Sequence, residues 1–217
     1  MTDAYIYDAA RTPRGKGRPD GSLHEVTSVA LSARLLNAVK ARNGLEGHAV
    51  EDVIWGNVTQ VKEQGGCLAR SAVLESGLDQ SIPGLSINRF CTSGMEAVNL
   101  AANQVKAGAG DAYIAGGVEM MSRVPMGSDG AAIAVDPSLT FPTYFVPQGI
   151  SADIIATEYG FSREDADRLA MDMGEAGDQG RAIIRLEGLE DAAIDHAGDH
   201  LAHVEGLLQI GADDALD

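Results

Sequence analysis

The stretch NRFCTSGMEAVNLAANQVKAGAGDAYIAGGVEMMSR, residues Asn88–Arg123, decides the fold. The apolar run of residues 84–90 leads into it and predicts a β-strand. Apolar residues then recur three or four positions apart from Met95 to Val105, which predicts a helix, and residues 111–121 predict a further strand. A strand, a helix and a strand in this order predict a parallel βαβ unit, with Cys91 at its first strand-to-helix junction.

The same alternation of strands and helices continues toward the N-terminus. Residues 4–11 and 52–58 predict strands, and residues 25–42 and 69–77 predict helices. The Asn-Gly pair at positions 43–44 is a stop signal for the first helix. This alternation predicts an α/β fold with a mixed, mostly parallel sheet that is layered with helices.

Cys91 is a candidate nucleophile because its predicted position favours a thiolate. Only the thiolate attacks an acyl carbon, and the unpaired N–H groups and positive dipole end of a helix N-terminus stabilise negative charge. Thr92, Ser93 and Gly94 are small enough for a bulky acyl donor to approach the sulfur, and the N–H of Cys91 is a candidate oxyanion donor. The alternative is an inert, buried cysteine, since free cysteine is among the most buried residue types.

Composition excludes several classes of function. The net charge is −16, from 16 basic and 32 acidic residues, which argues against nucleic acid or an anionic membrane as a partner. No apolar run approaches the ~18 uncharged residues of a membrane span, and the first residues lack the basic start and apolar middle of a secretory signal. A cytoplasmic location is therefore predicted. Cys67 and Cys91 are expected to be free thiols rather than a disulfide.

Charge and composition change along the chain. Residues 1–150 carry 12 basic and 15 acidic side chains, whereas residues 151–217 carry 4 and 17. Residues 122–149 hold four of the seven prolines without a regular period, which is typical of a functional or mobile excursion. Helical patterns resume at 151–160 and 162–171, the second with Ser162 as its N-cap. After residue 171 there is no aromatic residue and no Ser, Thr, Pro or Lys, so order and disorder are both open there.

Several motifs together resemble one enzyme family. The nucleophile segment NRFCTSGMEAV and the following GDAYIAGGVEMMSRVPMG resemble the active-cysteine segment and glycine-rich strand of thiolases. The segments RTPRGK, GNVTQ, GGCLARSAVLESGL and GISADIIATEYGFSRED resemble further thiolase segments, in the order of the family. The resemblance covers most of residues 1–170.

The resemblance implies a thiolase-like fold that is incomplete, with the N-terminal half and part of the family's loop domain. Residues 1–121 would form the α/β domain with the nucleophile, residues 122–170 a partial loop domain, and residues 171–217 a divergent acidic tail. The family forms dimers or tetramers, so a homo-oligomer is expected. An apolar sheet face without its matching half would also favour association or low solubility.

The implied activity is acyl transfer between coenzyme A thioesters through an acyl-enzyme on Cys91, by Claisen condensation or by thiolytic cleavage of a 3-ketoacyl-CoA. Coenzyme A and acyl-CoA are then substrates, and neither a cofactor nor a metal is expected. Met121 and Met126 are candidate acyl-pocket residues, although methionine near a core strand commonly serves in packing.

The acid and base groups of this chemistry are missing from the sequence. Thiolases take them from a Gly-His-Pro triplet, a Cys-x-Gly motif and an asparagine that holds a water, and neither the triplet nor the Cys-x-Gly motif occurs in these 217 residues. The chain alone is therefore predicted to be inactive or incomplete. Cys67 precedes Cys91 and lacks the following x-Gly, so it is interpreted as a small residue at a strand-to-helix junction.

The five histidines give no clear base. His24 and His48 are expected to face solvent at a helix edge and in a loop. The spacing of His196, His200 and His203 is compatible with zinc on one helical face, but Gly198 interrupts that segment and the family uses no metal.

Four alternatives remain open from sequence. One is another condensing enzyme, such as a ketoacyl synthase, although GGVEMMSR suits a thiolase better. The second is a truncated remnant whose tail comes from a shifted reading frame. The third is a non-catalytic thiolase-like subunit, which would leave Cys91 unreactive. A genuine short subunit that completes its site with a partner chain is the fourth arrangement consistent with the missing motifs.

Overall fold

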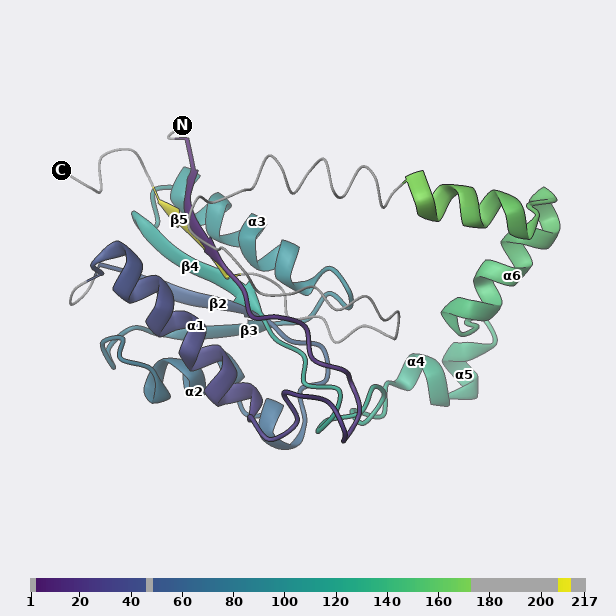
Figure 1. Cartoon of the computed structure of the whole chain (residues 1–217), viewed down its shortest axis with the longest axis horizontal. Coiled ribbons are helices and arrows are strands. Elements are labelled where there is room, and N and C mark those ends of the chain that lie inside the picture. The colour runs from purple at the N-terminus through teal and green to yellow at the C-terminus, as the bar shows by residue number, and fades with distance from the viewer. Residues whose placement is uncertain (1–2, 46–48, 173–206, 212–217) are drawn as a thin grey trace. The chain divides into compact units, whose positions relative to one another are not determined.

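The computed structural model describes residues 3–45, 49–172 and 207–211, the last of these by its backbone (Figure 1). The chain divides into two compact units. One comprises Met1–Asp129 together with Asp199–Asp217, and the other comprises Gly130–Gly198. Most of the predicted acidic tail, including His196, His200 and His203, lies outside the described residues, as does His48.

The first unit is built on a sheet of five strands within the described residues. Its strand order is β1 (Tyr5–Ala10), β5 (Leu207–Gly211), β4 (Ala112–Gly117), β2 (Asp52–Gly56) and β3 (Gly84–Ile87). β2 is parallel to both β3 and β4, whereas β5 is antiparallel to both β1 and β4. β1 therefore runs in the same direction as β4, and only β5 opposes the others. The predicted mixed, mostly parallel α/β sheet is confirmed.

Helices cover both faces of this sheet (Figure 1). Val53 and Trp55 of β2 pack with α1 (Ser28–Asn43) and α2 (Leu68–Glu75), whereas Ile54 between them packs with α3 (Ser93–Lys106). Successive side chains of a strand point to opposite faces, so three consecutive buried residues belong to two different cores. A central strand with both faces buried explains the continuously apolar sequence of β2.

Local signals set the ends of α1. The helix begins after Thr27, whose hydroxyl accepts a hydrogen bond from Ala30 N at 3.1 Å, and it ends before Gly44 in the left-handed conformation. The sequence pattern predicted a start at residue 25. The start is later because Val26 N donates to Leu23 O at 3.0 Å, in a turn that precedes the cap.

β3 and β4 end three and four residues earlier than their apolar patterns predicted. β3 stops at Ile87 rather than at residue 90, and β4 stops at Gly117 rather than at residue 121. In both cases the next residues make turns and side-chain hydrogen bonds in place of a strand ladder. Hydrophobic patterning does not separate these residues from a strand, because they are also partly apolar.

The second unit is helical within its described part. It contains α4 (Ala132–Val135), α5 (Pro137–Thr140), α6 (Gln148–Tyr159) and a helical run over 163–172. Ser162 caps that run as predicted, with Asp165 N donating to Ser162 Oγ at 3.1 Å and Ser162 N donating to the Asp165 carboxylate at 3.0 Å.

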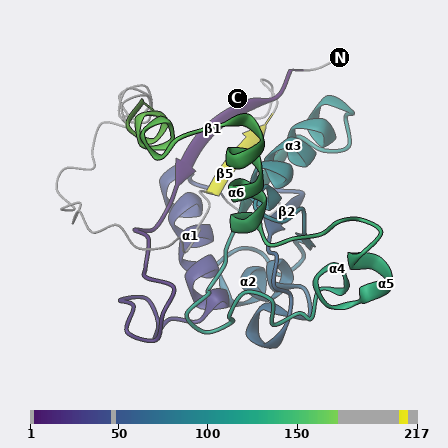
Figure 2. The same ribbon diagram turned by 90° about the vertical axis from the view of Figure 1, so that its right-hand side faces the viewer.

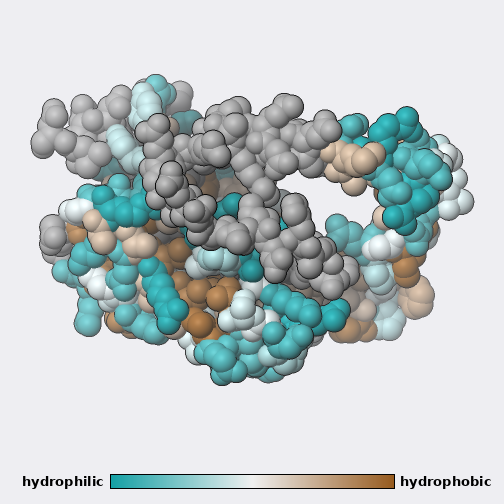
Figure 3. All heavy atoms as spheres, in the orientation of Figure 1, coloured by the Kyte–Doolittle hydropathy of each residue, from teal (hydrophilic) through white to brown (hydrophobic). Residues whose placement is uncertain are grey.

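α6 buries none of its residues, and apolar side chains reach the surface of this unit (Figure 3). The large apolar side chains exposed on or next to α6 are Ile150, Ile154, Ile155, Tyr159 and Phe161. The division at residues 121–122 and 170–171 remains a prediction. Within residues 3–45, 49–172 and 207–211, every helix falls short of the length and apolar character that a bilayer crossing requires.

The position of β5 gives a first testable prediction. β5 is the strand that links β1 to β4, and β1 and β5 lie side by side (Figure 2). A chain that ends at Gly206 should therefore lose the β1 ladder, and amide exchange in Tyr5–Ala10 should rise by at least about tenfold, equivalent to ~1.4 kcal/mol of protection. Hydrogen-exchange mass spectrometry measures this rise. A chain that ends at Gly211 is the matched control, and equal protection of β1 in both chains would contradict the topology.

Candidate active site

Cys91 lies on a tight turn, residues 88–92, between the end of β3 and the start of α3. The sequence predicted this strand-to-helix junction. The side chain of Cys91 is exposed, so the alternative that it is a buried packing residue does not apply. An exposed sulfur at this place is open to an electrophile from solvent.

The turn holds Phe90 in an unusual backbone conformation. Phe90 has φ of 49°, in the left-handed region that costs a residue with a Cβ about 1–2 kcal/mol. Phe90 N donates to Asn88 Oδ1 at 2.8 Å, and Phe90 O accepts from Ser93 N at 3.0 Å and from Ser93 Oγ at 2.6 Å. Strain of this kind persists where surrounding contacts over-determine the backbone, and it occurs preferentially at functional sites.

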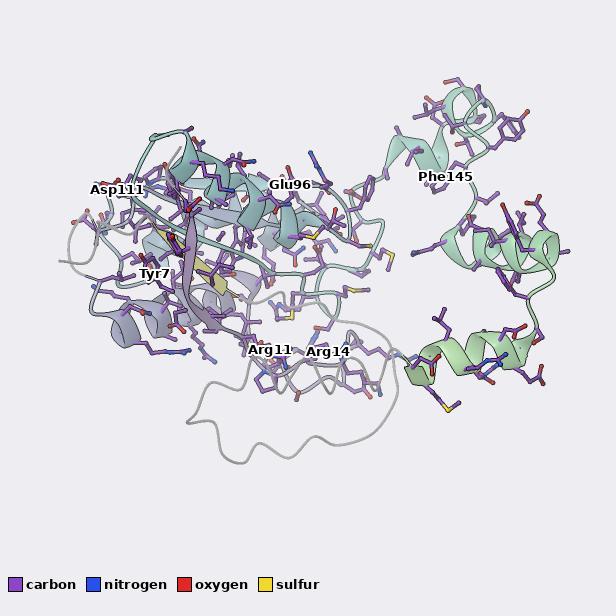
Figure 4. All side chains as sticks on the ribbon, turned by 90° about the horizontal axis from the view of Figure 1, so that it is seen from above. Tyr7, Arg11, Arg14, Glu96, Asp111 and Phe145 are labelled. Atoms are coloured by element: carbon purple, nitrogen blue, oxygen red, sulfur yellow. The ribbon has the colours of Figure 1, made fainter. Side chains whose placement is uncertain are left out.

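Ser93 ties the two sides of the turn together. Its hydroxyl accepts from Arg89 N at 2.9 Å as well as donating to Phe90 O, and the residue is buried. Arg89 also forms an ion pair with Glu96 of α3, with Nη1 and Oε2 2.9 Å apart; Glu96 is labelled on the ribbon of Figure 4. An exposed pair of this kind contributes about 0–1 kcal/mol, so the buried hydroxyl is the stronger restraint.

The first turn of α3 supplies backbone N–H groups for a negative charge. Its N-cap residue, Thr92, makes no side-chain cap. The Thr92 hydroxyl donates instead to Arg89 O, at 2.8 Å. Ser93 N donates to Phe90 O at 3.0 Å, whereas no side chain caps the helix. The remaining first-turn N–H groups and the positive end of the helix dipole are therefore candidates for stabilising a negative charge near Cys91.

Two glycines let this helix start approach the sheet. A Cβ at Gly56, the last residue of β2, would lie 2.6 Å from Gly94 N and from the carbonyl carbon of Ser93. A Cβ at Gly117, the last residue of β4, would lie 2.7 Å from Gly56 O. The carboxyl ends of both strands are thus free of side chains where α3 begins, which is the common place for a site in an α/β sheet. Neither glycine was predicted to have this role, because each lies inside an apolar segment that was predicted to be a strand.

A buried polar cluster fixes the loop that follows β2. The Glu119 carboxylate accepts hydrogen bonds from Val58 N at 2.9 Å and from Gln64 Nε2 at 2.7 Å. Gln64 is fully buried, and its Oε1 accepts from Met120 N at 2.7 Å. Asn57 Nδ2 donates to Val118 O at 3.0 Å. These bonds join the segments after β2 and β4, and the signal for them was the polar residues within the GNVTQ and GGVE motifs.

The two predicted acyl-pocket methionines have different surroundings. Met121 is half-buried, whereas Met126 is 77% exposed. Met120, between the glycine-rich strand and Met121, is the methionine that belongs to the apolar core under α1 and α2. Phe90 and Met95 are 62% and 61% exposed and flank Cys91 in the sequence. They are apolar candidates that the sequence analysis did not single out.

Three other titratable residues, His24, Cys67 and Asp52, are partly buried. His24 is half-buried rather than solvent-facing, and its Nδ1 is buried without a hydrogen-bond partner. Cys67 is half-buried at the start of α2, where its Sγ donates to Gly84 O at 3.2 Å. Burial raises the pKa of the Asp52 carboxyl, but Asp52 opens β2 at its amino end, away from the end that faces α3. Within residues 3–45, 49–172 and 207–211, no group of three or more metal-ligating side chains gathers.

Comparison with known families identifies the chain. Residues 4–179 match the family described as thiolase, N-terminal domain. The chain belongs to the thiolase family.

Curated thiolases match the same part of the chain. It is 39% identical over 170 residues to a 3-ketoacyl-CoA thiolase of Colwellia psychrerythraea, a match of 77% of this chain and 43% of that protein. It is 35% identical over 196 residues to a 3-ketoacyl-CoA thiolase of Alcanivorax borkumensis, covering 86% and 49%. A Shewanella 3-ketoacyl-CoA thiolase is 37% identical over 174 residues, covering 79% and 44%. The chain thus spans less than half the length of these thiolases.

Replacement of Gly56 by alanine tests the packing that positions the segment with Cys91. The new Cβ meets backbone rather than a mobile side chain. We expect Gly56→Ala to destabilise the chain by about 1–3 kcal/mol, as overpacking does, and to lower Tm by about 2–4 °C per kcal/mol. Differential scanning calorimetry measures the change. Gly149→Ala is the control, because nothing lies within 4 Å of its Cβ position, and an equal response of both variants would contradict the close approach.

Proposed function

We propose that this chain supplies the nucleophilic half of a thiolase that transfers acyl groups between coenzyme A thioesters through Cys91. The observation that carries the proposal is the exposed Cys91 on a strained turn at the uncapped start of α3. Membership of the thiolase family gives the reaction class. The names of the relatives support a 3-ketoacyl-CoA as the longer substrate.

The first half-reaction is attack of the Cys91 thiolate on the thioester carbonyl of an acyl-CoA. A C–S bond to Cys91 forms, and the carbonyl oxygen takes up the electron pair as an oxyanion. The N–H of Cys91 and the first-turn N–H groups of α3 are the proposed donors to this oxyanion. Collapse of the tetrahedral intermediate breaks the bond to coenzyme A, which leaves as a thiolate and takes up a proton.

The second half-reaction returns the enzyme to its starting state. In the condensation direction, the enolate of acetyl-CoA attacks the acyl carbon on Cys91, so that a C–C bond forms and the Cys91 thiolate is released. In the degradative direction, the Cys91 thiolate attacks the 3-keto carbon of a 3-ketoacyl-CoA, the bond between carbons 2 and 3 breaks, and the enolate of acetyl-CoA leaves and takes up a proton. The thiolate of coenzyme A then attacks the acyl carbon on Cys91, which forms a shortened acyl-CoA and releases the Cys91 thiolate. Either direction needs a base for the thiol and a second group for the α-carbon proton.

These acid and base groups are proposed to come from a segment outside the 217 residues, since the Gly-His-Pro and Cys-x-Gly motifs do not occur among them. Met121 and Met126 are proposed to line the acyl chain. The proposal extends to a role in fatty acid metabolism, a cytoplasmic location and a homo-oligomer, dimer or tetramer. Exposed Leu85 on the edge strand β3 and the exposed apolar residues of α6 support association.

A second candidate is a non-catalytic thiolase-like subunit. The 217 residues contain neither the Gly-His-Pro nor the Cys-x-Gly motif, so they hold no assigned group that would generate the enolate. The two functions differ at Cys91. A nucleophile reacts with electrophiles much faster than the half-buried Cys67, whereas an interaction subunit has no need of a reactive Cys91.

Acyl labelling tests the proposed function. We expect incubation with acetyl-CoA or a longer acyl-CoA to add one acyl group to the chain, located at Cys91 by peptide mass spectrometry. Cys91→Ser should reduce the labelling to background, because a serine hydroxyl at this site lacks the acidity to form the anion. Cys67→Ser is the control and should label normally. Labelling that persists in Cys91→Ser, or that maps to Cys67, would exclude the proposal.

A further inference from the structure

We propose that Asn88 and Glu119 are positioning residues that hold Cys91 in its reactive geometry through the backbone of Val58. This inference rests on the proposed function, since it explains how the nucleophile of that reaction is presented. The juxtaposition is between the turn before α3, the loop after β2 and the carboxylate that follows β4. None of the three groups needs to touch a substrate for this role.

Asn88 makes two hydrogen bonds that act in different directions. Its Oδ1 accepts from Phe90 N at 2.8 Å, which closes an Asx turn over the residue with φ of 49°. Its Nδ2 donates to Val58 O at 3.2 Å, in the loop after β2. The side chain thus supports the left-handed conformation of Phe90 and ties it to a neighbouring segment. Asn88 is exposed and contributes nothing to the apolar cores.

Glu119 extends the same connection to the end of β4. Its Oε2 accepts a hydrogen bond from Val58 N at 2.9 Å. The carbonyl of the same residue, Val58, accepts the hydrogen bond from Asn88 Nδ2. The other carboxylate oxygen accepts from the buried Gln64 amide at 2.7 Å, which holds Glu119 in place. Hydrogen bonds to a charged acceptor are about twice as strong as those between neutral groups. The turn that carries Cys91 is thereby connected to a half-buried carboxylate that the fully buried Gln64 holds in place.

The consequence of this connection is the direction of Cys91. Phe90 immediately precedes Cys91, so its φ and ψ angles set where the Cys91 N–H and side chain point. Without Asn88, Phe90 can relax to a negative φ, which most residues prefer. Cys91 would then move away from the first-turn N–H groups of α3 that stabilise a thiolate and an oxyanion. Loss of Asn88 should lower the reactivity of Cys91 without unfolding the chain.

Alkylation by iodoacetamide measures this reactivity on the full chain. Trypsin places Cys67 in the peptide 63–70 and Cys91 in the peptide 90–106, since Lys62, Arg70, Arg89 and Lys106 bound them. The ratio of the two alkylation rates is therefore read from one digest. For Asn88→Ala we expect the Cys91 rate to fall by about tenfold, the loss that corresponds to one hydrogen bond of about 1.4 kcal/mol. The Cys67 rate should not change.

Further variants separate positioning from general damage. Asn99→Ala, at an exposed site on α3, is the control and should behave as the wild type. Phe90→Gly should restore reactivity in the Asn88→Ala background, because glycine adopts a positive φ without the Cβ penalty. Glu119→Gln should lower the alkylation rate of Cys91 by a smaller factor than Asn88→Ala does. The Asn88→Ala/Glu119→Gln double variant should react no more slowly than Asn88→Ala alone, because both residues act through Val58.

The outcomes distinguish this inference from the function on which it rests. If wild-type Cys91 reacts no faster than Cys67, both the proposed function and the positioning role are overturned. If wild-type Cys91 reacts faster than Cys67 but Asn88→Ala leaves its alkylation rate unchanged, the positioning role alone is overturned. A fall that Phe90→Gly does not restore, or that Cys67 shares, also overturns it, since it would indicate a general loss of structure.

Discussion

The close approach of the first turn of α3 to Gly56 is the constraint on which the candidate site depends. The backbone of Ser93 and Gly94 occupies the space that a Cβ on Gly56 would fill. Gly117, on the neighbouring strand β4, is similarly close to Gly56, because a Cβ on Gly117 would meet the backbone of Gly56. The helix starts directly on the carboxyl ends of two parallel strands, the place where α/β proteins bind ligands. Cys91 immediately precedes Thr92, the N-cap residue of this helix, and its side chain is exposed.

Two kinds of interaction stabilise different parts of this chain. Apolar packing on both faces of the sheet positions the strands and helices, as the burial of Val53, Ile54 and Trp55 on alternate faces shows. Polar contacts instead hold the turn that precedes and includes Cys91, the proposed nucleophile. A left-handed Phe90 costs about 1–2 kcal/mol and a single hydrogen bond contributes about 1 kcal/mol, so several bonds to the turn are needed to keep it. The structure provides them from Asn88 and Ser93.

Sequence periodicity predicted the local elements and the junction that holds Cys91, because those depend on residues close together in the chain. It did not predict that residues 207–211 insert between β1 and β4, since five apolar-rich residues carry no mark of which strands they will join. The sequence also did not predict the positive φ of Phe90. An aromatic residue rarely adopts this conformation, and only the contacts of the surrounding turn enforce it. Glu119 belongs to the GGVEMMSR motif, but its hydrogen-bond partners lie about 60 positions away in the chain. Such long-range pairing is common in parallel sheets and cannot be inferred from neighbouring residues. The roles of Met121 and Met126 remain predictions.

The most direct test of the account is a crystal structure of the chain with an acyl group attached to Cys91. The account predicts that Phe90 keeps a positive φ, that Asn88 still bridges Phe90 N and Val58 O, and that the acyl oxygen lies about 2.7–3.1 Å from the N–H of Cys91 or from a first-turn N–H of α3. An acyl oxygen that points into solvent without such a donor, or a Phe90 with negative φ, would contradict the claim that this turn and helix start form the acyl-transfer site.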